Sequence, residues 1–261
     1  MKKAIKIMAL VFALVMVAMC FTGCGEKVIV AEKESAGEGV AKNLEGYKYT
    51  AVDTQAKALM EVAAGTADAA IIDYVMSIGS IGKGTDYENI VVSGEGYNPE
   101  EYGIAFRKGS DATAKVNEAI ATLKQNGKLV EIANKYKLGE LITATNTFDA
   151  FTQSATNSDW EYIKNKGELI IGITYFAPMN YKNDAGELVG FETEFAKAVC
   201  DVLGVTAKFQ EISWTAKETE LAAKNIDCIW NGMTITEERA ENMSITIPYM
   251  TNKQVMVVKD K

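Results

Sequence analysis

The chain has 261 residues, of which 48% are hydrophobic, so it is long enough for one large or two modest globular domains. Its 35 acidic and 27 basic residues give a formal net charge of -8, which argues against nucleic acid and anionic lipid as binding partners. The sequence contains no histidine, which excludes histidine-based catalytic triads and histidine-ligated metal sites. We expect no metal and no cofactor.

The N-terminus has the features of a secretory signal, because three early lysines precede the apolar run 8–19. Residues 21–24, Phe-Thr-Gly-Cys, resemble the bacterial lipoprotein box, in which the cysteine becomes N-terminal and carries lipid. We therefore expect residues 1–23 to be a lipoprotein signal peptide and Cys24 to be lipidated. This lipid would anchor the protein to the cell membrane on its extracytoplasmic side. An uncleaved anchor helix is the alternative.

Residues 27–103 alternate between short apolar runs, typical of strands, and amphipathic or capped segments, typical of helices. Ser35 and Glu38 have the spacing of a capping box. Asp73 ends a fully apolar run and could act as the N-cap of the helix that follows. The expected strands are 27–31, 47–52, 69–72, 89–92 and 101–107, with a Gly- and Pro-containing loop between the last two, and the expected helices are 38–44, 54–64 and 74–81.

The C-terminal part continues the alternation after residues 143–158, which are rich in Thr, Ser, Asn and Ala and predict a linker. Cys200 falls in a helix and Cys228 in a strand, so we expect two buried free thiols, with a disulfide as the alternative. Asp184-x-Gly186 indicates a hairpin-like turn. The expected helices are 111–125, 129–136, 160–166 and 191–203, and the expected strands are 169–174, 207–212, 226–229 and 254–258.

The segment 230–239, Trp-Asn-Gly-Met-Thr-Ile-Thr-Glu-Glu-Arg, carries the most specific pattern. It leads from a buried strand, through a turn relaxed by Gly232, into a helix capped by Thr234 or Thr236. Strand ends and helix N-termini bind anions in α/β sheets. A cation in a first helical turn interacts unfavourably with the helix dipole, at a cost of roughly 0.3–1 kcal/mol. This cost indicates a function for Arg239, and we expect Arg239 and Thr234 to bind a carboxylate. A surface arginine balanced by neighbouring glutamates is the alternative.

Residues 231–239, followed by Ser-Ile-Thr-Ile-Pro-Tyr at 244–249, resemble the signature of the family 3 extracellular solute-binding proteins. These are the polar amino-acid-binding proteins of bacterial ABC importers. The resemblance implies an α/β fold of the periplasmic-binding-protein type II, with two βαβ lobes joined by two hinge strands. It also implies a small-molecule amino acid as ligand and an ABC transporter permease as partner.

The resemblance assigns ligand-binding roles to residues of both lobes. In lobe 1, four residues would surround the α-carboxylate and two aromatic side chains would face each other across the ligand. In lobe 2, an aspartate would pair with the α-ammonium group and a helix N-terminus would close over the carboxylate. The lobe 1 residues are Arg239, Thr234, Gly232 and Asn231 with Phe176 and Trp214, and the lobe 2 residues are Asp73, Ser35, Ala36 and Gly37.

The order of the matching segments is rotated relative to the family. In the family, a hinge strand such as 254–258 is followed by a segment that resembles the one beginning at Lys27 in this chain. The resemblance therefore implies a circular permutation. Lobe 2 would then comprise 27–103 and 250–261, and lobe 1 would comprise 108–142 and 159–249. We expect a monomer, with a swapped dimer that exchanges lobes as the alternative.

Two other functions remain open. A cyclohexadienyl (arogenate or prephenate) dehydratase on the same fold would need a buried acidic residue with a raised pKa. A ligand-sensing partner of a membrane receptor is the other alternative. We expect a binding protein and no enzyme. The amino acid bound is not predicted, although Thr174 and Tyr175, where binders of basic amino acids tend to keep an acidic group, argue against lysine or arginine.

Overall fold

The computed structural model describes residues 26–143 and 155–260. The predicted signal peptide, the lipidation site at Cys24 and most of the predicted linker therefore lie outside the described residues. No helix within these two ranges is long and apolar enough to cross a membrane.

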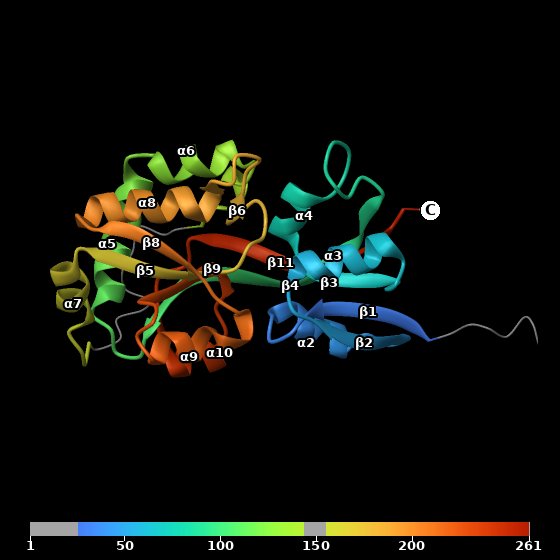
Figure 1. Cartoon of the computed structure of the whole chain (residues 1–261), viewed down its shortest axis with the longest axis horizontal. Coiled ribbons are helices and arrows are strands. Elements are labelled where there is room, and N and C mark those ends of the chain that lie inside the picture. The colour runs from blue at the N-terminus through green and yellow to red at the C-terminus, as the bar shows by residue number, and fades with distance from the viewer. Residues whose placement is uncertain (1–25, 144–154, 261) are drawn as a thin grey trace, which may run out of the picture.

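One mixed sheet runs through the whole molecule (Figure 1). Its strand order is β2-β1-β3-β11-β4-β9-β5-β8, and a short strand, β10, pairs with β4. Both ends of the sheet are parallel, whereas the two central strands are antiparallel to each other and to their neighbours. The bounds are β1 Lys27–Glu32, β2 Tyr47–Val52, β3 Ala69–Asp73, β4 Ile90–Arg107, β5 Glu168–Ile173, β8 Thr206–Glu211, β9 Cys228–Thr234, β10 Met243–Ile245 and β11 Met250–Lys259.

The sheet therefore has two similar halves that the long strands β4 and β11 join. We call the part built on β1, β2 and β3 the β3 half, and the part built on β5, β8 and β9 the β9 half (Figure 1). This arrangement confirms the predicted α/β fold class. Parallel strands need helical connections, which explains why helices alternate with strands in both halves.

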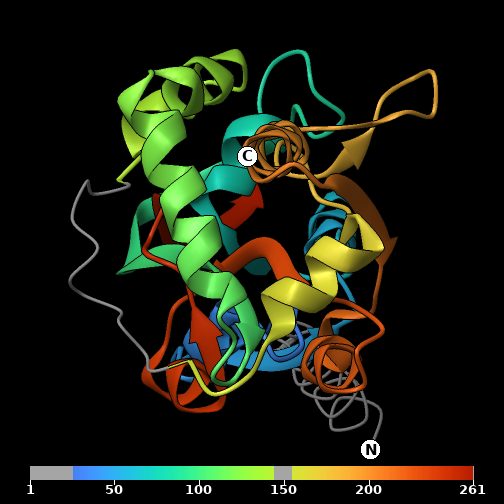
Figure 2. The same cartoon turned by 90° about the vertical axis from the view of Figure 1, so that its left-hand side faces the viewer.

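Helices cover both halves (Figure 1). At the outer end of the β9 half, α5 and α7 lie beside each other (Figure 2). The apolar stripe predicted for α5 is buried, as Val116, Ile120 and Leu123 show. The β3 half carries α2 Ala36–Lys42, α3 Gln55–Ala64 and α4 Tyr74–Ser80. The β9 half carries α5 Ala112–Gln125, α6 Lys128–Lys135, α7 Asp159–Lys166, α8 Phe191–Leu203, α9 Lys217–Ala222 and α10 Glu237–Asn242. The predicted hairpin turn lies between β6 Tyr181–Lys182 and β7 Leu188–Val189, and two short 3-10 helices span Gly139–Leu141 and Trp214–Ala216.

The prediction of two short strands around a loop at 93–100 is wrong. A single strand, β4, runs from Ile90 to Arg107 and pairs with β11 along most of its length. Gly94 and Gly96 have φ values of 81° and 98°, and register shifts interrupt the pairing beside them. The Gly and Pro residues therefore mark irregularities within a paired strand.

The predicted strand end at residue 229 is also wrong. Strand β9 continues to Thr234, because β4 pairs with it at Tyr102 opposite Thr234 and Gly103 opposite Met233. Gly232 lies inside this strand with a φ of 54°, next to a register shift, so it forms a bulge instead of a turn into the helix.

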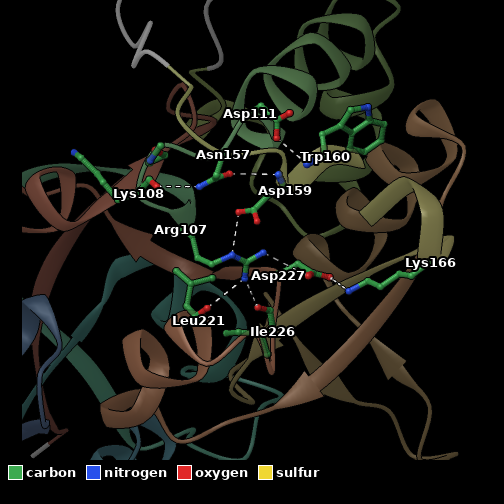
Figure 3. Close-up of polar contacts among 12 residues, drawn as sticks. Arg107, Lys108, Asp111, Asn157, Asp159, Trp160, Lys166, Leu221, Ile226 and Asp227 are labelled. Carbon is green, nitrogen blue, oxygen red and sulfur yellow. Dashed lines mark hydrogen bonds and ion pairs between the residues drawn. The ribbon is translucent and has the colours of Figure 1, made fainter. Parts of the chain in front are cut away.

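Arg107, the last residue of β4, joins three elements of the β9 half (Figure 3). Its Nε donates to Asp159 at the start of α7 (2.9 Å), and its Nη1 donates to the carbonyl groups of Leu221 (3.2 Å) and Ile226 (2.9 Å). Its Nη2 lies 3.7 Å from Asp227 Oδ1. Both aspartates are buried, so this guanidinium holds α7 and the turn before β9 against the end of β4.

Cys200 and Cys228 are both buried free thiols, in agreement with the prediction. Burial raises the pKa of Cys200 to about 12 and the pKa of Cys228 well above its usual value. Both side chains therefore remain protonated and pack as small apolar groups.

The start of β1 and the end of β11 lie on opposite sides of the same part of β3. Ile29 is paired with Ala69, and Val257 is paired with Ala70. Two strand spacings separate such positions by roughly 10 Å. The two ends of the described chain therefore reach the same outer edge of the β3 half (Figure 1).

Candidate functional site

A cavity of about 20 Å³ lies between the two halves. This volume holds about one water molecule, so an amino acid can enter only if the halves or their side chains move apart. Nine of the ten residues predicted to bind a ligand line this cavity. The lining residues are Glu32, Ser35, Ala36, Gln55, Asp73, Thr174, Phe176, Trp214, Asn231, Gly232, Thr234 and Arg239.

Arg239 is held in place by α10 and by the cavity walls. Thr236 is the N-cap of α10, and its hydroxyl accepts a hydrogen bond from Arg239 N (3.2 Å), so the expected box based on Thr234 does not form. The guanidinium donates to the carbonyl groups of Thr234 (2.7 Å) and Glu34 (3.2 Å). It lies 5.7 Å from the ring centre of Trp214. Since a guanidinium has five donors, most of them remain available to an anion.

Asn231 and Gly232 support the cavity floor. The Asn231 amide accepts from Thr174 N (2.9 Å) and donates to Thr174 O (3.0 Å), which ties the end of β9 to the end of β5. Gly232 N donates to the buried carboxyl of Glu192 (2.8 Å), so this N–H is not free to bind a ligand carboxylate. A side chain at position 232 would meet the Phe176 ring at 2.9 Å, so a residue without a side chain is needed here.

Glu192 is a buried acidic group directly beneath the cavity. It accepts hydrogen bonds from Gly232 N, from Asn180 Nδ2 (2.8 Å) and from the Tyr249 hydroxyl. Burial raises the pKa of Glu192 to about 7, although these donors partly oppose the shift.

Asp73 faces the cavity and does not cap the helix that follows it. It occupies the N-cap position of α4 but makes no side-chain capping bond. Its carboxyl instead accepts from the amides of Asn252 (2.7 Å), Gln254 (2.5 Å) and Gln55. Burial raises the pKa of Asp73, and the three amide donors act against this shift. The capping alternative is therefore wrong.

Two further acidic groups accompany Asp73. Glu32 ends β1 and is only 5% exposed, and burial together with the charge of Asp73 raises its pKa to about 8. Glu100, in β4, accepts from the Asn252 and Gln254 amides that also donate to Asp73. Burial and Asp73 raise the pKa of Glu100 to about 7. The cavity is therefore strongly acidic on the side of the β3 half.

The turn before α2 closes the cavity. The Ser35 hydroxyl accepts from Glu38 N (3.1 Å) and donates to Glu32 O (2.7 Å), so it caps α2 as its spacing predicted. Gly37 does not line the cavity, because it packs against Ile71 and Gln254. Ala36 does line it.

Glu34 connects the halves directly. Its carbonyl accepts from Trp214 Nε1 (3.1 Å) and from Arg239 Nη2, and its carboxylate lies 3.5 Å from Lys217 Nζ. Its φ of 61° lies in the left-handed region. These contacts hold the two halves closed over the cavity.

The sequence-based prediction missed Glu32, Gln55 and Thr174 among the lining residues. Glu32 and Thr174 lie at the carboxyl ends of predicted parallel strands, where ligands of α/β sheets bind, and this rule could have found them. Gln55 gave no comparable signal, because its contact with Asp73 joins residues 18 positions apart.

Residues 169–261 match the model of the bacterial extracellular solute-binding proteins, family 3. This C-terminal part of the chain is therefore similar to that family. The matched residues include β5, β8 and β9 and the lining residues from Thr174 to Arg239.

Several known proteins of this family are similar to part of the chain. The L-cystine-binding protein TcyJ of Escherichia coli K12 is 33% identical over 98 residues, 37% of each chain. A probable amino-acid ABC transporter-binding protein of Haemophilus influenzae is 30% identical over 120 residues, 46% of each chain. A histidine-bound substrate-binding protein of an ABC uptake transporter from Streptococcus pneumoniae has a solved structure that is 36% identical over 32% of this chain and 35% of that one, with a TM-score of 0.31. The chain thus spans less than half the length of the curated relatives it matches.

Proposed function

We propose that this protein is the extracytoplasmic substrate-binding component of an ABC importer and binds an amino acid between its two halves. The observation that carries the proposal is the position of Arg239 and Asp73. They come from opposite halves, carry opposite charges and line the same cavity. A zwitterion needs such a pair, one partner for its α-carboxylate and one for its α-ammonium group.

Binding would occur in the open state and closure would complete the site. Arg239 and Thr234 would receive the α-carboxylate, with Phe176 and Trp214 beside the rest of the ligand. Asp73 would receive the α-ammonium group, and the Ser35–Ala36 turn would close over the ligand. A ligand can shift the equilibrium toward the closed state only if it gains contacts there, and a ligand that bridges both halves does so.

A thermal-shift screen with the twenty amino acids tests this function, because a ligand that binds only the folded state raises the unfolding temperature. We expect at least one amino acid to stabilise the purified protein. Arg239→Ala and Asp73→Ala should abolish this effect without unfolding the free protein. The exposed residues Lys48 and Asp53 provide matched controls, since Lys48→Ala and Asp53→Ala should keep the effect. If no amino acid stabilises the unaltered protein, the proposed function is wrong, and if either site variant still responds, its residue does not bind the ligand.

We infer further that the chain is a circular permutant of the family pattern, with the lobes as predicted from the sequence. Support comes from the family match, which begins at residue 169, and from the ends of β1 and β11, which reach the same edge of the β3 half. A rearranged gene that joins position 261 to position 27 by a short linker and opens the 143–158 segment should yield a protein that binds the same amino acid. Lipidation at Cys24, a permease partner and a monomeric state belong to the same proposal.

An enzyme on this fold is the second candidate, and Glu32 is the observation that favours it. A buried carboxyl with a raised pKa that lines the cavity could act as a general acid in the dehydration of prephenate or arogenate. Incubation with prephenate decides the matter. The appearance of phenylpyruvate, lost in Glu32→Gln, supports the enzyme, whereas unchanged prephenate supports the binding protein.

A further inference from the structure

The cavity has more acidic than basic residues around it. Glu32 and Asp73 line it, and Glu100 lies behind Asp73, because the Asn252 amide donates to both. Arg239 is the only cationic residue among those that line the cavity. In the part of the chain that the structure describes, no lysine or arginine nitrogen forms an ion pair with any of these three carboxyls.

The two lining carboxyls differ in how many of their acceptor positions are used. Asp73 accepts from three amides and also interacts with the Tyr102 hydroxyl, which leaves at most about one of its four positions for an ammonium group. Among the described residues, Glu32 has one side-chain donor, Gln55, whose amide also donates to Asp73, and the charge of Lys217 acts to lower the pKa of Glu32 without forming an ion pair with it. Glu32 therefore keeps most of its acceptor capacity although it is almost fully buried.

An amino acid with a neutral side chain would leave Glu32 without an ion pair, because Lys217, whose charge acts on Glu32, pairs with Glu34. Its α-carboxylate would take Arg239 and its α-ammonium group would take Asp73. A buried carboxylate without a cation is costly, so Glu32 would have to stay protonated, in keeping with the rise of its pKa that burial and Asp73 cause. A second cationic group beside Glu32 would remove this cost.

We propose that Glu32 binds a second cationic group of the ligand, so that the site selects amino acids with an ammonium or guanidinium group on the side chain. This inference rests on the proposed function. Because Gln55 contacts both Glu32 and Asp73, the second cation lies close to the α-ammonium group, which fits a short diamino acid. Glu32 thus supplies, from the β3 half, the acidic group that Thr174 and Tyr175 lack.

Isothermal titration of the purified protein with matched pairs of ligands tests the proposal. In the first pair, 2,4-diaminobutyrate has an ammonium group where homoserine has a hydroxyl. In the second pair, arginine has a guanidinium group where citrulline has a urea group of the same shape. We expect the cationic member of at least one pair to bind tighter by about tenfold or more, since a desolvated charge pair contributes far more than an exposed one.

Glu32→Gln keeps the size and the carbonyl oxygen of the side chain and should reduce that ratio to about twofold or less, because the charge attraction is gone. The matched control is Glu218→Gln, which removes an exposed negative charge from α9 and should preserve the ratio. Neutral members that bind as tightly as the cationic ones in both pairs of the unaltered protein would overturn the proposal and leave amino-acid binding intact. If no amino acid binds at all, the proposed function fails and this inference fails with it.

Discussion

The two halves of the sheet repeat one arrangement but treat their buried charges differently. In the β9 half, the buried carboxylates Asp159 and Asp227 are matched by Arg107 and Lys166. In the β3 half, Glu32 and Asp73 have neutral amides as neighbours and no ion pair among the described residues.

This difference shows that the buried aspartates of the β9 half are paired with cations, whereas the buried carboxyls of the β3 half depend on protons or on a ligand. Glu192, in α8, is a buried carboxyl of the β9 half whose pKa is raised in the same way. Buried carboxyls that lack cations hold protons at neutral pH, because burial disfavours the charged form. The β9 half contributes Arg239 and two aromatic rings to the cavity, and the β3 half contributes acidic groups. A ligand with both charges would therefore complete the half that is incomplete by itself.

Loss of the charge match in the β9 half should have the largest effect. Arg107→Ala leaves the buried Asp159 without its cation, whereas Asp227 keeps Lys166 at 2.6 Å. Removal of one partner from a buried pair costs about 3–5 kcal/mol. Urea unfolding should show this decrease in the free energy of unfolding. The control is Lys115→Ala, whose ion pair with Glu118 is exposed and worth at most about 1 kcal/mol. Equal losses for the two variants would contradict the charge match.

The β3 half should make stability dependent on pH. The pKa values of Glu32 and Glu100 are raised to about 8 and about 7, from 4.5, so the folded protein holds protons that the unfolded chain has lost. The contribution of these two carboxyls to the free energy of unfolding is therefore fully present below pH 4.5 and is lost as the pH rises toward 8. The loss is up to about 1.4 kcal/mol per pH unit for each group. The free energy of unfolding should therefore decrease as the pH is raised from 5 to 8.

Glu100→Gln sharpens the pH experiment, because it keeps the oxygen that accepts from Asn252 and Gln254 but cannot ionise. The slope of stability against pH should be smaller in this variant. A flat profile for the unaltered protein would mean that the β3 half has its counter-charges after all.

Removal of a helix cap should affect amino-acid binding differently in the two halves. Thr236 caps α10 and Ser35 caps α2, so Thr236→Ala and Ser35→Ala should each lower the free energy of unfolding by about 1 kcal/mol. Thr236→Ala should also weaken amino-acid binding, because its hydroxyl holds the main chain of Arg239. Unchanged affinity in this variant would indicate that α10 does not position the cation.

The smallest effect is expected at the contact between the halves. Trp214→Phe keeps an aromatic ring but loses the hydrogen bond to the Glu34 carbonyl, which is worth about 0.5–1.5 kcal/mol. The ligand should bind correspondingly more weakly, and the stability of the free protein should change little. A titration with the best ligand of the screen measures the difference, and an equal loss in stability would assign Trp214 to the core instead.

Much of the fold could be predicted because it follows from local patterns. The apolar run at β3, the capping residue Ser35 and the apolar stripe on α5 predicted their elements to within a few residues. Most lining residues of the cavity were also predicted, because they follow the ends of parallel strands or lie in the segment 230–239 that resembles the family. These signals lie within short stretches of the chain.

The remaining features depend on pairing between segments far apart in the sequence. Pairing with β11 made a strand of residues that contain Gly94, Gly96 and Pro99, and pairing with β4 carried β9 through Gly232. The sequence by itself determined the helices, the parallel strands and most of the residues that surround the cavity. Only the tertiary structure placed Asn252 beside Asp73, 179 positions away, and left Glu32 buried without an ion pair among the described residues, because burial and hydrogen-bond partners depend on which segments meet.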